Sequence, residues 1–320
     1  MPEPIISVIM PCYNQARFLP EAVASLRAQV YSHWECIIVN DGSSDNTAQL
    51  AMTSASFDSR VRLINQKNLG PAAARNRGLE EANGQIIHFL DGDDYILPGM
   101  YEKMIEVFKT RSDAVAAYSG FQLVTEDRSV LCSFPVLPES ADVFHDLLRR
   151  NPWPCHAVMV RKAIVDAVGR FDEALKGPED WDLWLRVAST GGRFIPVSGE
   201  PACYRRYANT ISKNNRRMLE AGLAVLERNR GLHKSCRLCA SAVTRGRLRW
   251  GIHCWSGFRS EVEQMPRIGQ LFSYLRFFFY MGRKHLRPAC MLFGTLLHGW
   301  LVARNLLREK SPRLNANSRQ

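Results

Sequence analysis

The sequence contains neither of the glycine-rich loops that commonly hold the phosphates of a nucleotide. No Gly-x-Gly-x-x-Gly follows the first apolar run, and no Gly-x-x-x-x-Gly-Lys-Ser/Thr occurs in the 320 residues. These absences exclude a Rossmann-type dinucleotide site and a P-loop. Any nucleotide diphosphate must therefore be held in another way.

Long hydrophobic runs are also missing. The longest stretch without Asp, Glu, Lys or Arg, residues 288–303, has 16 residues. As a helix it measures about 24 Å at 1.5 Å per residue. That is shorter than the membrane's hydrocarbon core of about 30 Å, so we expect no membrane span. The N-terminus has no basic segment followed by a long apolar core, so we expect no signal peptide and a cytoplasmic protein.

Acidic residues are scarce in the last third of the chain. From residue 201 onward there are 23 Lys and Arg against 5 Asp and Glu, whereas the whole chain carries a net charge of +11. The first 200 residues therefore have a balance of −7. An acidic region followed by a strongly basic one predicts two regions with different partners.

The nine cysteines are irregularly spaced, unlike those of a disulfide framework. Cys236-x-x-Cys239 has a metal-ligand spacing, and His233, His253 and Cys254 are near it in the sequence. Four zinc ligands are therefore available. The alternative is that Cys236 and Cys239 share one face of a basic helix, because residues three apart are helical neighbours. A single Cys-x-x-Cys does not decide between the two.

Short apolar runs alternate with segments of helical periodicity in the first part of the chain. We predict strands at residues 5–10, 35–39, 61–64, 85–90, 114–118 and 157–161. We predict helices at residues 18–28, 46–52, 71–82, 98–110, 141–149 and 179–188. This alternation is typical of a mostly parallel α/β sheet. Beyond residue 212 the strand patterns end and basic helical segments follow.

Carboxylates follow two of the predicted strands. Asp41 comes after the second strand, and Asp91-Gly92-Asp93-Asp94 comes after the fourth. Ligands of parallel sheets bind at the carboxyl ends of the strands, so we expect both groups to line one crevice. Crowded carboxylates favour a cation, and Mg²⁺ and Mn²⁺ prefer oxygen ligands such as carboxylates and phosphates. We therefore predict a metal-held diphosphate here; the alternative is a solvated polar turn.

Five short motifs occur in a fixed order along the first 210 or so residues. They are Pro11-Cys12-Tyr13-Asn14, Asn40-Asp41-Gly42-Ser43-Ser44-Asp45, Ala73-Ala74-Arg75-Asn76, Leu90-Asp91-Gly92-Asp93-Asp94 and Glu179-Asp180-Trp181-Asp182-Leu183-Trp184. Together they resemble the inverting family 2 glycosyltransferases. The resemblance implies a GT-A-type, Rossmann-like, mostly parallel sheet flanked by helices as a catalytic domain over residues 1–212. Residues 213–320 then form a basic, aromatic-rich helical region.

The resemblance also implies a donor site. Pro11 and Tyr13 match positions that border the nucleotide base, and Asp41 matches the Asp that accepts a hydrogen bond from uracil. Arg75 and Asn76 match the segment beneath the donor sugar. We therefore expect a nucleotide-diphosphate sugar, with UDP as the leading nucleotide.

Three further positions match the metal and the catalytic base. Asp91 matches the residue near the ribose and the metal, and Asp93 matches the one that binds Mn²⁺ or Mg²⁺ and hence the diphosphate. Asp180 matches the catalytic base. A carboxylate at a helix start in a cleft can take the proton of an attacking hydroxyl, although acidic residues at a helix start also serve as simple helix caps.

The sequence departs from the family pattern at two places. Tyr207, in Tyr204-Arg205-Arg206-Tyr207, stands where the family often has His, although Arg205 could still meet a phosphate. Gly246 stands where processive synthases have the Gln of Gln-x-x-Arg-Trp, which favours a non-processive enzyme. His156 precedes a predicted strand and is interpreted as a packed histidine rather than a catalytic one.

The expected acceptor is a hydroxyl of a glycan or lipid-linked glycan in cell-envelope polysaccharide synthesis. The alternatives are a sugar nucleotidyltransferase and a non-catalytic module that binds nucleotide sugars or membranes. Residues 268–303 hold apolar blocks interleaved with Arg and Lys. This pattern favours a peripheral helix on the anionic inner face of the membrane; a packed helical subdomain is the other interpretation. No nucleic-acid module is present, so nucleic acid is not an expected partner.

Overall fold

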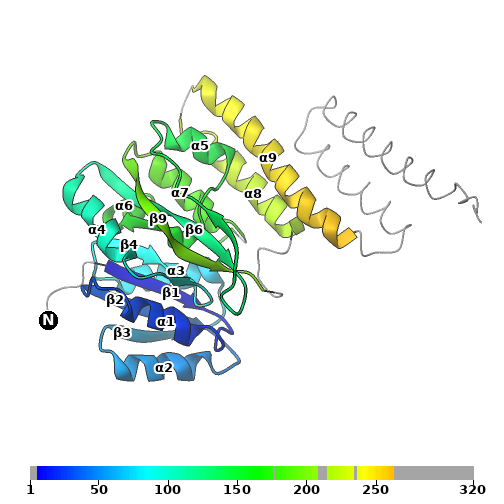
Figure 1. Cartoon of the computed structure of the whole chain (residues 1–320). Coiled ribbons are helices and arrows are strands. Elements are labelled where there is room, and N and C mark those ends of the chain that lie inside the picture. The colour runs from blue at the N-terminus through cyan, green and yellow to red at the C-terminus, as the bar shows by residue number, and fades with distance from the viewer. Residues whose placement is uncertain (1–5, 176, 208–214, 234–235, 263–320) are drawn as a thin grey trace, which may run out of the picture. The chain divides into compact units, whose positions relative to one another are not determined.

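The computed structural model describes residues 6–175, 177–207, 215–233 and 236–262 (Figure 1). The chain divides into two compact units, Met1–Trp250 and Gly251–Gln320. The account below concerns the first unit. Residues 268–303, for which a membrane-surface helix is predicted, lie outside the described residues.

The first half of this unit is the predicted alternation of strands and helices. The strands are β1 (Ile6–Cys12), β2 (Trp34–Asp41), β3 (Val61–Gln66) and β4 (Ile86–Phe89). The helices between them are α1 (Leu19–Arg27), α2 (Thr47–Phe57) and α3 (Pro71–Glu81). β1 pairs in parallel with β2 and β4, and β2 pairs in parallel with β3. The carboxyl ends of all four strands therefore meet at one edge of the sheet.

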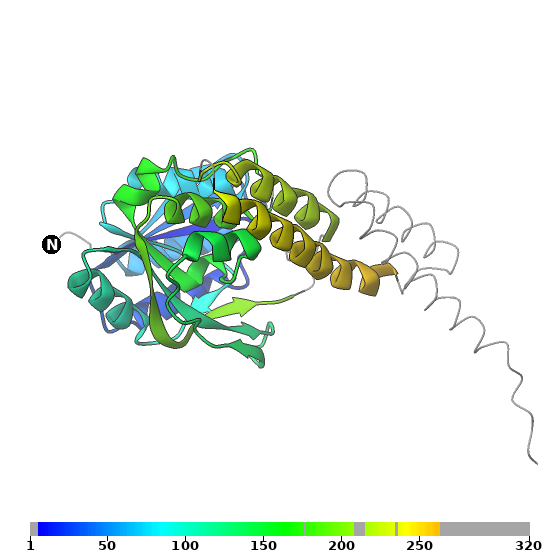
Figure 2. The same cartoon turned by 90° about the horizontal axis from the view of Figure 1, so that it is seen from above.

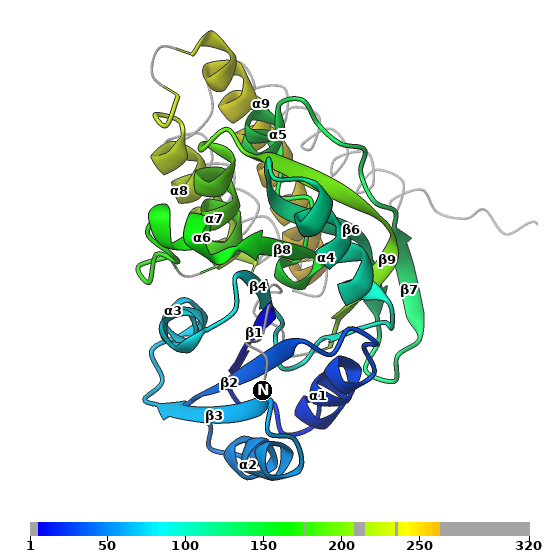
Figure 3. The ribbon, with the colours of Figure 1, turned by 90° about the vertical axis from the view of Figure 1, so that its left-hand side faces the viewer.

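The two faces of this sheet bury different residues because side chains alternate along a strand. Val8 and Met10 of β1 belong to a hydrophobic cluster with α1, whereas Ile9 belongs to a second cluster with α3. Figure 3 shows α1 and α3 on opposite sides of β1 and β2. Every residue of β1 and β2 is buried, as expected for strands covered on both faces.

The second half extends the sheet with antiparallel strands. Its elements are β5 (Tyr95–Ile96), α4 (Met100–Thr110), β6 (Ala114–Val124), β7 (Val130–Phe134), α5 (Val143–Arg149), η1 (Cys155–Ala157), β8 (Val158–Arg161), α6 (Lys162–Ala167), α7 (Glu179–Ala188) and β9 (Arg193–Arg205). The strand order is β3-β2-β1-β4-β8-β6-β9-β5, and β7 pairs with β6. β8 is antiparallel to both of its neighbours, and β9 is parallel to β6. The predicted α/β sheet flanked by helices is thus confirmed, with four parallel and four antiparallel strand pairings among the described residues.

Two helices of the basic region pack within the same compact unit. They are α8 (Asn215–Asn229) and the first part of α9 (Arg237–Val262), which lie side by side in Figures 1 and 2. The indole N–H of Trp250 donates to the carbonyl of Met218 at 3.0 Å, and the ring of Trp250 lies 5.2 Å from that of Trp181 in α7. The first compact unit therefore runs past the domain boundary predicted at residue 212. None of the described helices is both long enough and apolar enough to span a membrane.

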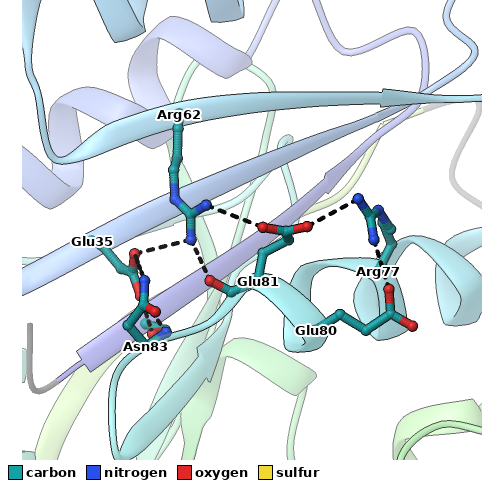
Figure 4. Close-up of polar contacts among 7 residues, drawn as sticks. Glu35, Arg62, Arg77, Glu80, Glu81 and Asn83 are labelled. Atoms are coloured by element: carbon teal, nitrogen blue, oxygen red, sulfur yellow. Dashed lines mark hydrogen bonds and ion pairs between the residues drawn. The ribbon is translucent and has the colours of Figure 1, made fainter.

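The amino edge of the sheet is closed by a polar network (Figure 4). Glu35 accepts hydrogen bonds from the Ser7 hydroxyl and the Asn83 backbone N–H, each at 2.7 Å. Burial alone would raise the pKa of Glu35, but these hydrogen bonds lower it overall. Arg62 of β3 adds ion pairs to Glu35 and Glu81, which ties the end of α3 to the strands. The charged side chains of this network are paired with one another. The candidate functional residues lie at the opposite, carboxyl edge of the sheet.

Candidate active site

The loops that follow β1 and β2 at the carboxyl edge are joined by hydrogen bonds. The Asn14 backbone N–H donates to the Ser43 hydroxyl at 3.0 Å, and the Ser44 N–H donates to the Asn14 side-chain oxygen at 2.8 Å. Pro11 is buried in β1, whereas Tyr13 is 50% exposed beside these bonds. The first two sequence motifs therefore build one surface, with an exposed aromatic ring on it.

Asp41 ends β2 and organises the next connection. Its carboxylate accepts hydrogen bonds from the Gln66 side chain at 2.7 Å and from the backbone N–H groups of Leu69 and Gly70 at 2.9 Å each. The residue is 3% exposed. A carboxylate has about four acceptor positions, and three are used. The structure thus shows Asp41 holding the entrance to α3 through three hydrogen bonds, and its contact with the nucleotide base stays a prediction.

The acidic cluster begins two residues after β4, as predicted. Gly92 allows this turn to lie against β1, because a Cβ there would stand 2.6 Å from the Cys12 sulfur. Asp94 is buried and accepts the Arg205 backbone N–H at 2.7 Å, and its other oxygen lies 3.1 Å from Nδ1 of His156. Asp94 therefore faces the interior and anchors the cluster.

Asp93 differs from Asp94 in having no basic side chain paired with its carboxylate among the described residues. Burial, together with the nearby carboxylates of Asp94 and Asp91, raises the pKa of Asp93 to about 7. The phenol of Tyr207 donates a hydrogen bond to Asp93 at 2.8 Å. Oxygen donors crowded in this way, with phosphate as a further ligand, suit Mg²⁺ or Mn²⁺. The residues present therefore fit the metal that the sequence predicts.

Arg75 connects the acidic cluster to the start of α7. Its guanidinium forms ion pairs with Asp91 and Glu179, both at 2.6 Å, and its side chain is 5% exposed. Asn76, its neighbour, points elsewhere: its amide donates to the Phe171 carbonyl at 3.0 Å and accepts the Phe171 N–H at 3.0 Å. One buried guanidinium thus joins two motifs that are 88 residues apart in the sequence.

Asp180 lies in the first turn of α7, beside Glu179. Its Oδ1 accepts the Trp181 backbone N–H at 2.7 Å and the Asn151 side-chain amide at 3.3 Å. Burial and the charge of Glu179 raise the pKa of Asp180 to about 7. Among the residues that the structure describes, none donates a hydrogen bond to Oδ2. The hydrogen bonds to Oδ1 therefore orient the carboxylate. Its pKa lies close to neutral pH.

The next acidic residue of the motif, Asp182, has a structural environment instead. It is fully buried, pairs with Arg186 at 2.7 Å, and accepts a hydrogen bond from Asn229 of α8 at 2.8 Å. An acceptor hydroxyl could not reach it without unpacking α8. This geometry leaves Asp180 as the base candidate of the motif.

The stretch Tyr204–Tyr207 overlaps the end of β9, whose last residue is Arg205. Arg205 is 1% exposed, and its guanidinium donates to the carbonyls of Asp93 and Glu126 at 2.7 Å each and pairs with Glu21. Each of the three guanidinium nitrogens of Arg205 therefore has a partner inside the protein, which gives no support to a phosphate contact; that contact stays a prediction. Tyr207, in contrast, reaches Asp93, a contact that the sequence analysis missed.

His156 is packed, as predicted, but it is not isolated from the cluster. It is 1% exposed, and Asp94 raises its pKa against the opposing effect of burial. Its position on η1, directly before β8, places it beneath the acidic turn. The contact between His156 and Asp94 leaves Asp93 as the carboxylate of the two that has no basic side chain as a partner among the described residues.

Comparison with known proteins identifies the family. Residues 7–148 match the sequence profile described as Glycosyl transferase family 2. A Bacillus subtilis protein with the provisional name teichuronic acid biosynthesis glycosyltransferase TuaG is 32% identical over 214 residues, which cover 66% of this chain and 83% of TuaG. The chain belongs to the family 2 glycosyltransferases. The matched part covers only 26–63% of the length of several further glycosyltransferase relatives.

Solved glycosyltransferases share the fold. Residues 1–349 of Staphylococcus aureus TarS, in complex with UDP-GlcNAc, match with a TM-score of 0.62 and 19% identity over 85% of this chain and 80% of that one. The mannosyltransferase PcManGT of Pyrobaculum calidifontis, in complex with GDP-Man and Mn²⁺, matches with a TM-score of 0.59 and 16% identity over 93% and 81% of the two chains. These matches confirm the GT-A fold, and the family profile with the named relatives confirms a glycosyltransferase enzyme of family 2.

The departure at Gly246 has a structural reason in this family 2 glycosyltransferase. Gly246 lies in α9, and a Cβ there would stand 2.0 Å from the Leu148 carbonyl oxygen at the end of α5. A Gln at this position is incompatible with the packing of α9 on α5. The Gln-x-x-Arg-Trp pattern of processive synthases is thus replaced by a close helix contact.

Proposed function

We propose that this enzyme transfers a sugar, with inversion, from a UDP-sugar to a hydroxyl of a glycan or lipid-linked glycan, and adds one sugar per encounter. The observation that carries the proposal is the Arg75 bridge. The guanidinium of Arg75 pairs on one side with Asp91, a proposed metal ligand, and on the other side with Glu179, the neighbour of Asp180. A donor diphosphate and an acceptor base are needed within one site, and this arrangement supplies both.

In the proposed donor site, Tyr13 offers an exposed ring for the base and Asp41 offers its remaining acceptor position to uracil. Asp91 and Asp93 would hold the Mg²⁺ or Mn²⁺ ion. When bound, the ion supplies positive charge that neutralises the diphosphate leaving group. Arg75 holds Asp91 in place, and Tyr207 holds Asp93 through its phenolic hydrogen bond.

In the proposed chemical step, Asp180 accepts the proton of the acceptor hydroxyl. The hydroxyl oxygen bonds to the anomeric carbon of the donor sugar, and the bond from that carbon to the diphosphate breaks. The opposite face is attacked, so the configuration inverts. A base is most effective when its pKa is near the working pH, and burial places the pKa of Asp180 at about 7.

The proposed acceptor and location follow from charge and from the relatives' names. TuaG is named for the synthesis of a cell-envelope polymer, teichuronic acid. The basic balance after residue 201 suits a peripheral position on the anionic, cytoplasmic face of a membrane. Lipid-linked glycan acceptors are presented on such a surface.

The proposal is tested with UDP and a panel of UDP-, GDP- and dTDP-sugars. We expect Mn²⁺-dependent UDP binding by calorimetry, and thermal stabilisation that is largest for one class of donor. Asp93→Asn should abolish the metal dependence. Asp113→Asn, a change at an exposed surface carboxylate, is the matched control. Equal UDP affinity in EDTA and in Mn²⁺, or in wild type and Asp93→Asn, would contradict the metal-held diphosphate.

A further inference from the structure

Four side chains with metal-ligand atoms gather on the side of α5 that faces the basic region. They are His145 of α5, His233, Cys236 and Cys239, and their ligand atoms all lie within 4.8 Å of one another. Nε2 of His145 is 3.4 Å from the Cys236 sulfur and 3.3 Å from the Cys239 sulfur. We propose that these residues form a structural Zn²⁺ site, separate from the donor site.

The distances suit tetrahedral coordination. Zinc binds thiolate sulfur at about 2.3 Å and imidazole nitrogen at about 2.0–2.1 Å, so two such ligands in a tetrahedron stand about 3.6 Å apart. Both measured nitrogen–sulfur distances are within 0.3 Å of that value. The other pairs of ligand atoms lie within 4.8 Å of one another, so a bound zinc ion would draw the four side chains together by up to about 1 Å.

The histidine is already oriented as zinc proteins orient theirs. Nδ1 of His145 donates to the Asp142 carboxylate at 2.6 Å, which leaves the Nε2 lone pair facing the two sulfurs. Asp142 is itself fixed as the N-cap of α5, where it accepts the His145 backbone N–H at 3.3 Å. A carboxylate–histidine pair of this kind is typical of metal ligands.

Charge and burial also favour zinc. Two thiolates balance the +2 charge of the zinc ion, so the buried complex of metal and ligands is neutral. The two thiols release their protons to solvent when the complex forms. His145 and Cys239 are buried, and His233 and Cys236 are half-buried. Sulfur and imidazole ligands select zinc over Mg²⁺ or Mn²⁺. Four protein ligands leave no open position, which is the pattern of a structural rather than a catalytic zinc.

The ligand set corrects one of the sequence interpretations. His253 and Cys254 are not members of this group of described residues; the fourth ligand is His145, which is 88 residues before His233. The family profile ends at residue 148, so three of the four ligands lie outside it. The proposed site thus joins one ligand of the catalytic domain, His145, to three ligands of the basic region.

The position of the site explains what the zinc would do. It joins α5 to the chain that enters α9, and α5 is bonded to α7 through the Trp181 indole N–H and the Leu147 carbonyl at 2.7 Å. Trp181 follows Asp180 directly. We therefore expect zinc to fix the basic helices to the part of the catalytic domain that carries the base.

The test is the zinc content of the untagged, full-length protein, purified with a reducing agent. The zinc is measured by inductively coupled plasma mass spectrometry. We expect about one zinc per chain, as for other four-ligand structural sites. His145→Gln and the double variant Cys236→Ser/Cys239→Ser should lose it. Cys132→Ser, a change at an exposed cysteine, and Asp93→Asn, in the donor site, should retain it.

Three further measurements keep the proposal testable if a ligand variant fails to fold. Titration of the wild type with a mercurial should release zinc in step with thiol modification. Cobalt substitution should give the visible spectrum of a tetrahedral site with thiolate ligands. Asp142→Asn should weaken zinc binding by about 10- to 100-fold. The proposal is overturned if the reduced wild type holds no zinc and binds neither added zinc nor cobalt. It is also overturned if the double variant holds as much zinc as wild type, or if Cys236 and Cys239 form a disulfide in rapidly thiol-blocked protein.

Discussion

Replacing Arg75 by Met should destabilise the protein far more than the same change at Arg77, two residues along the same helix. Arg75 is 5% exposed and pairs with Glu179, which is 8% exposed, and with Asp91, which is 32% exposed. Arg77 is 44% exposed and pairs with Glu80 and Glu81 on the surface. The two substitutions remove the same charge from the same helix, so the difference between them reports burial.

The magnitude follows from what each change leaves behind. Met fills most of the volume of Arg75 but leaves Glu179 buried without a partner, and removal of one partner from a buried pair costs about 3–5 kcal/mol. Asp91 adds less, because its exposed side is screened by water. A surface pair such as that of Arg77 contributes about 0–1 kcal/mol. The expected difference between the two variants is therefore about 3 kcal/mol or more.

The assay is urea unfolding of the full chain, followed by tryptophan fluorescence. Trp181 and Trp184 are fully buried in α7, next to Glu179, and are two of the seven tryptophans that contribute to the emission. Adding Glu179→Gln to Arg75→Met should recover much of the loss, because the unpaired charge is gone. Equal unfolding midpoints for Arg75→Met and Arg77→Met would refute the reasoning.

The remaining predictions concern catalysis, metal binding and the membrane. Asp180→Asn should keep UDP binding but slow transfer by roughly 10² or more, the usual scale for a lost general base; near-normal turnover would move the base elsewhere. The wild-type kcat/KM should fall below about pH 7, as Asp180 becomes protonated, and a flat profile would contradict this assignment. Mn²⁺ affinity should fall over the same range because Asp93 must lose its proton, which calorimetry at pH 6 and pH 8 measures. Tyr207→Phe should weaken Mn²⁺ binding by about tenfold or more through loss of the hydrogen bond to Asp93. The full chain should sediment with anionic vesicles at low salt and be only partly released at high salt; no sedimentation would favour a packed helical subdomain for residues 213–320.

The strands that could be predicted from the sequence are those in which a short apolar run corresponds to a strand buried on both faces. β1, β2 and β4 are short, apolar and buried on both faces, so their runs in the sequence were sufficient to find them. β9 was missed although it has 13 residues. Pro196, Gly199 and Pro201 interrupt its pattern, and its pairing with β6 shifts register, so no alternation is readable. A strand of this kind is held by its partner strands rather than by its own propensity.

The residues of the candidate site also divide into those that the sequence could predict and those that it could not. Asp41, Asp91 and Asp93 follow apolar strands in the sequence, so their common edge could be deduced from topology alone. The Arg75 bridge and the His145 ligand could not, because each depends on helices brought together from distant parts of the chain. Periodicity reports which face of a helix is buried but not what that face meets. Long-range pairs of this type require the tertiary structure.

The substitution at Tyr207 shows how a departure from a family pattern can be interpreted too narrowly. Tyr in place of His removes an imidazole, and the sequence therefore put the contact at this position in doubt. The phenol nevertheless reaches Asp93 at 2.8 Å and is held there by the ring of Phe18, with the two centroids 5.1 Å apart. Unlike imidazole, the phenol stays neutral and remains a hydrogen-bond donor across the neutral pH range. Asp93 thus keeps an oriented oxygen without a competing positive charge, which is the condition under which a carboxylate remains available to a metal ion.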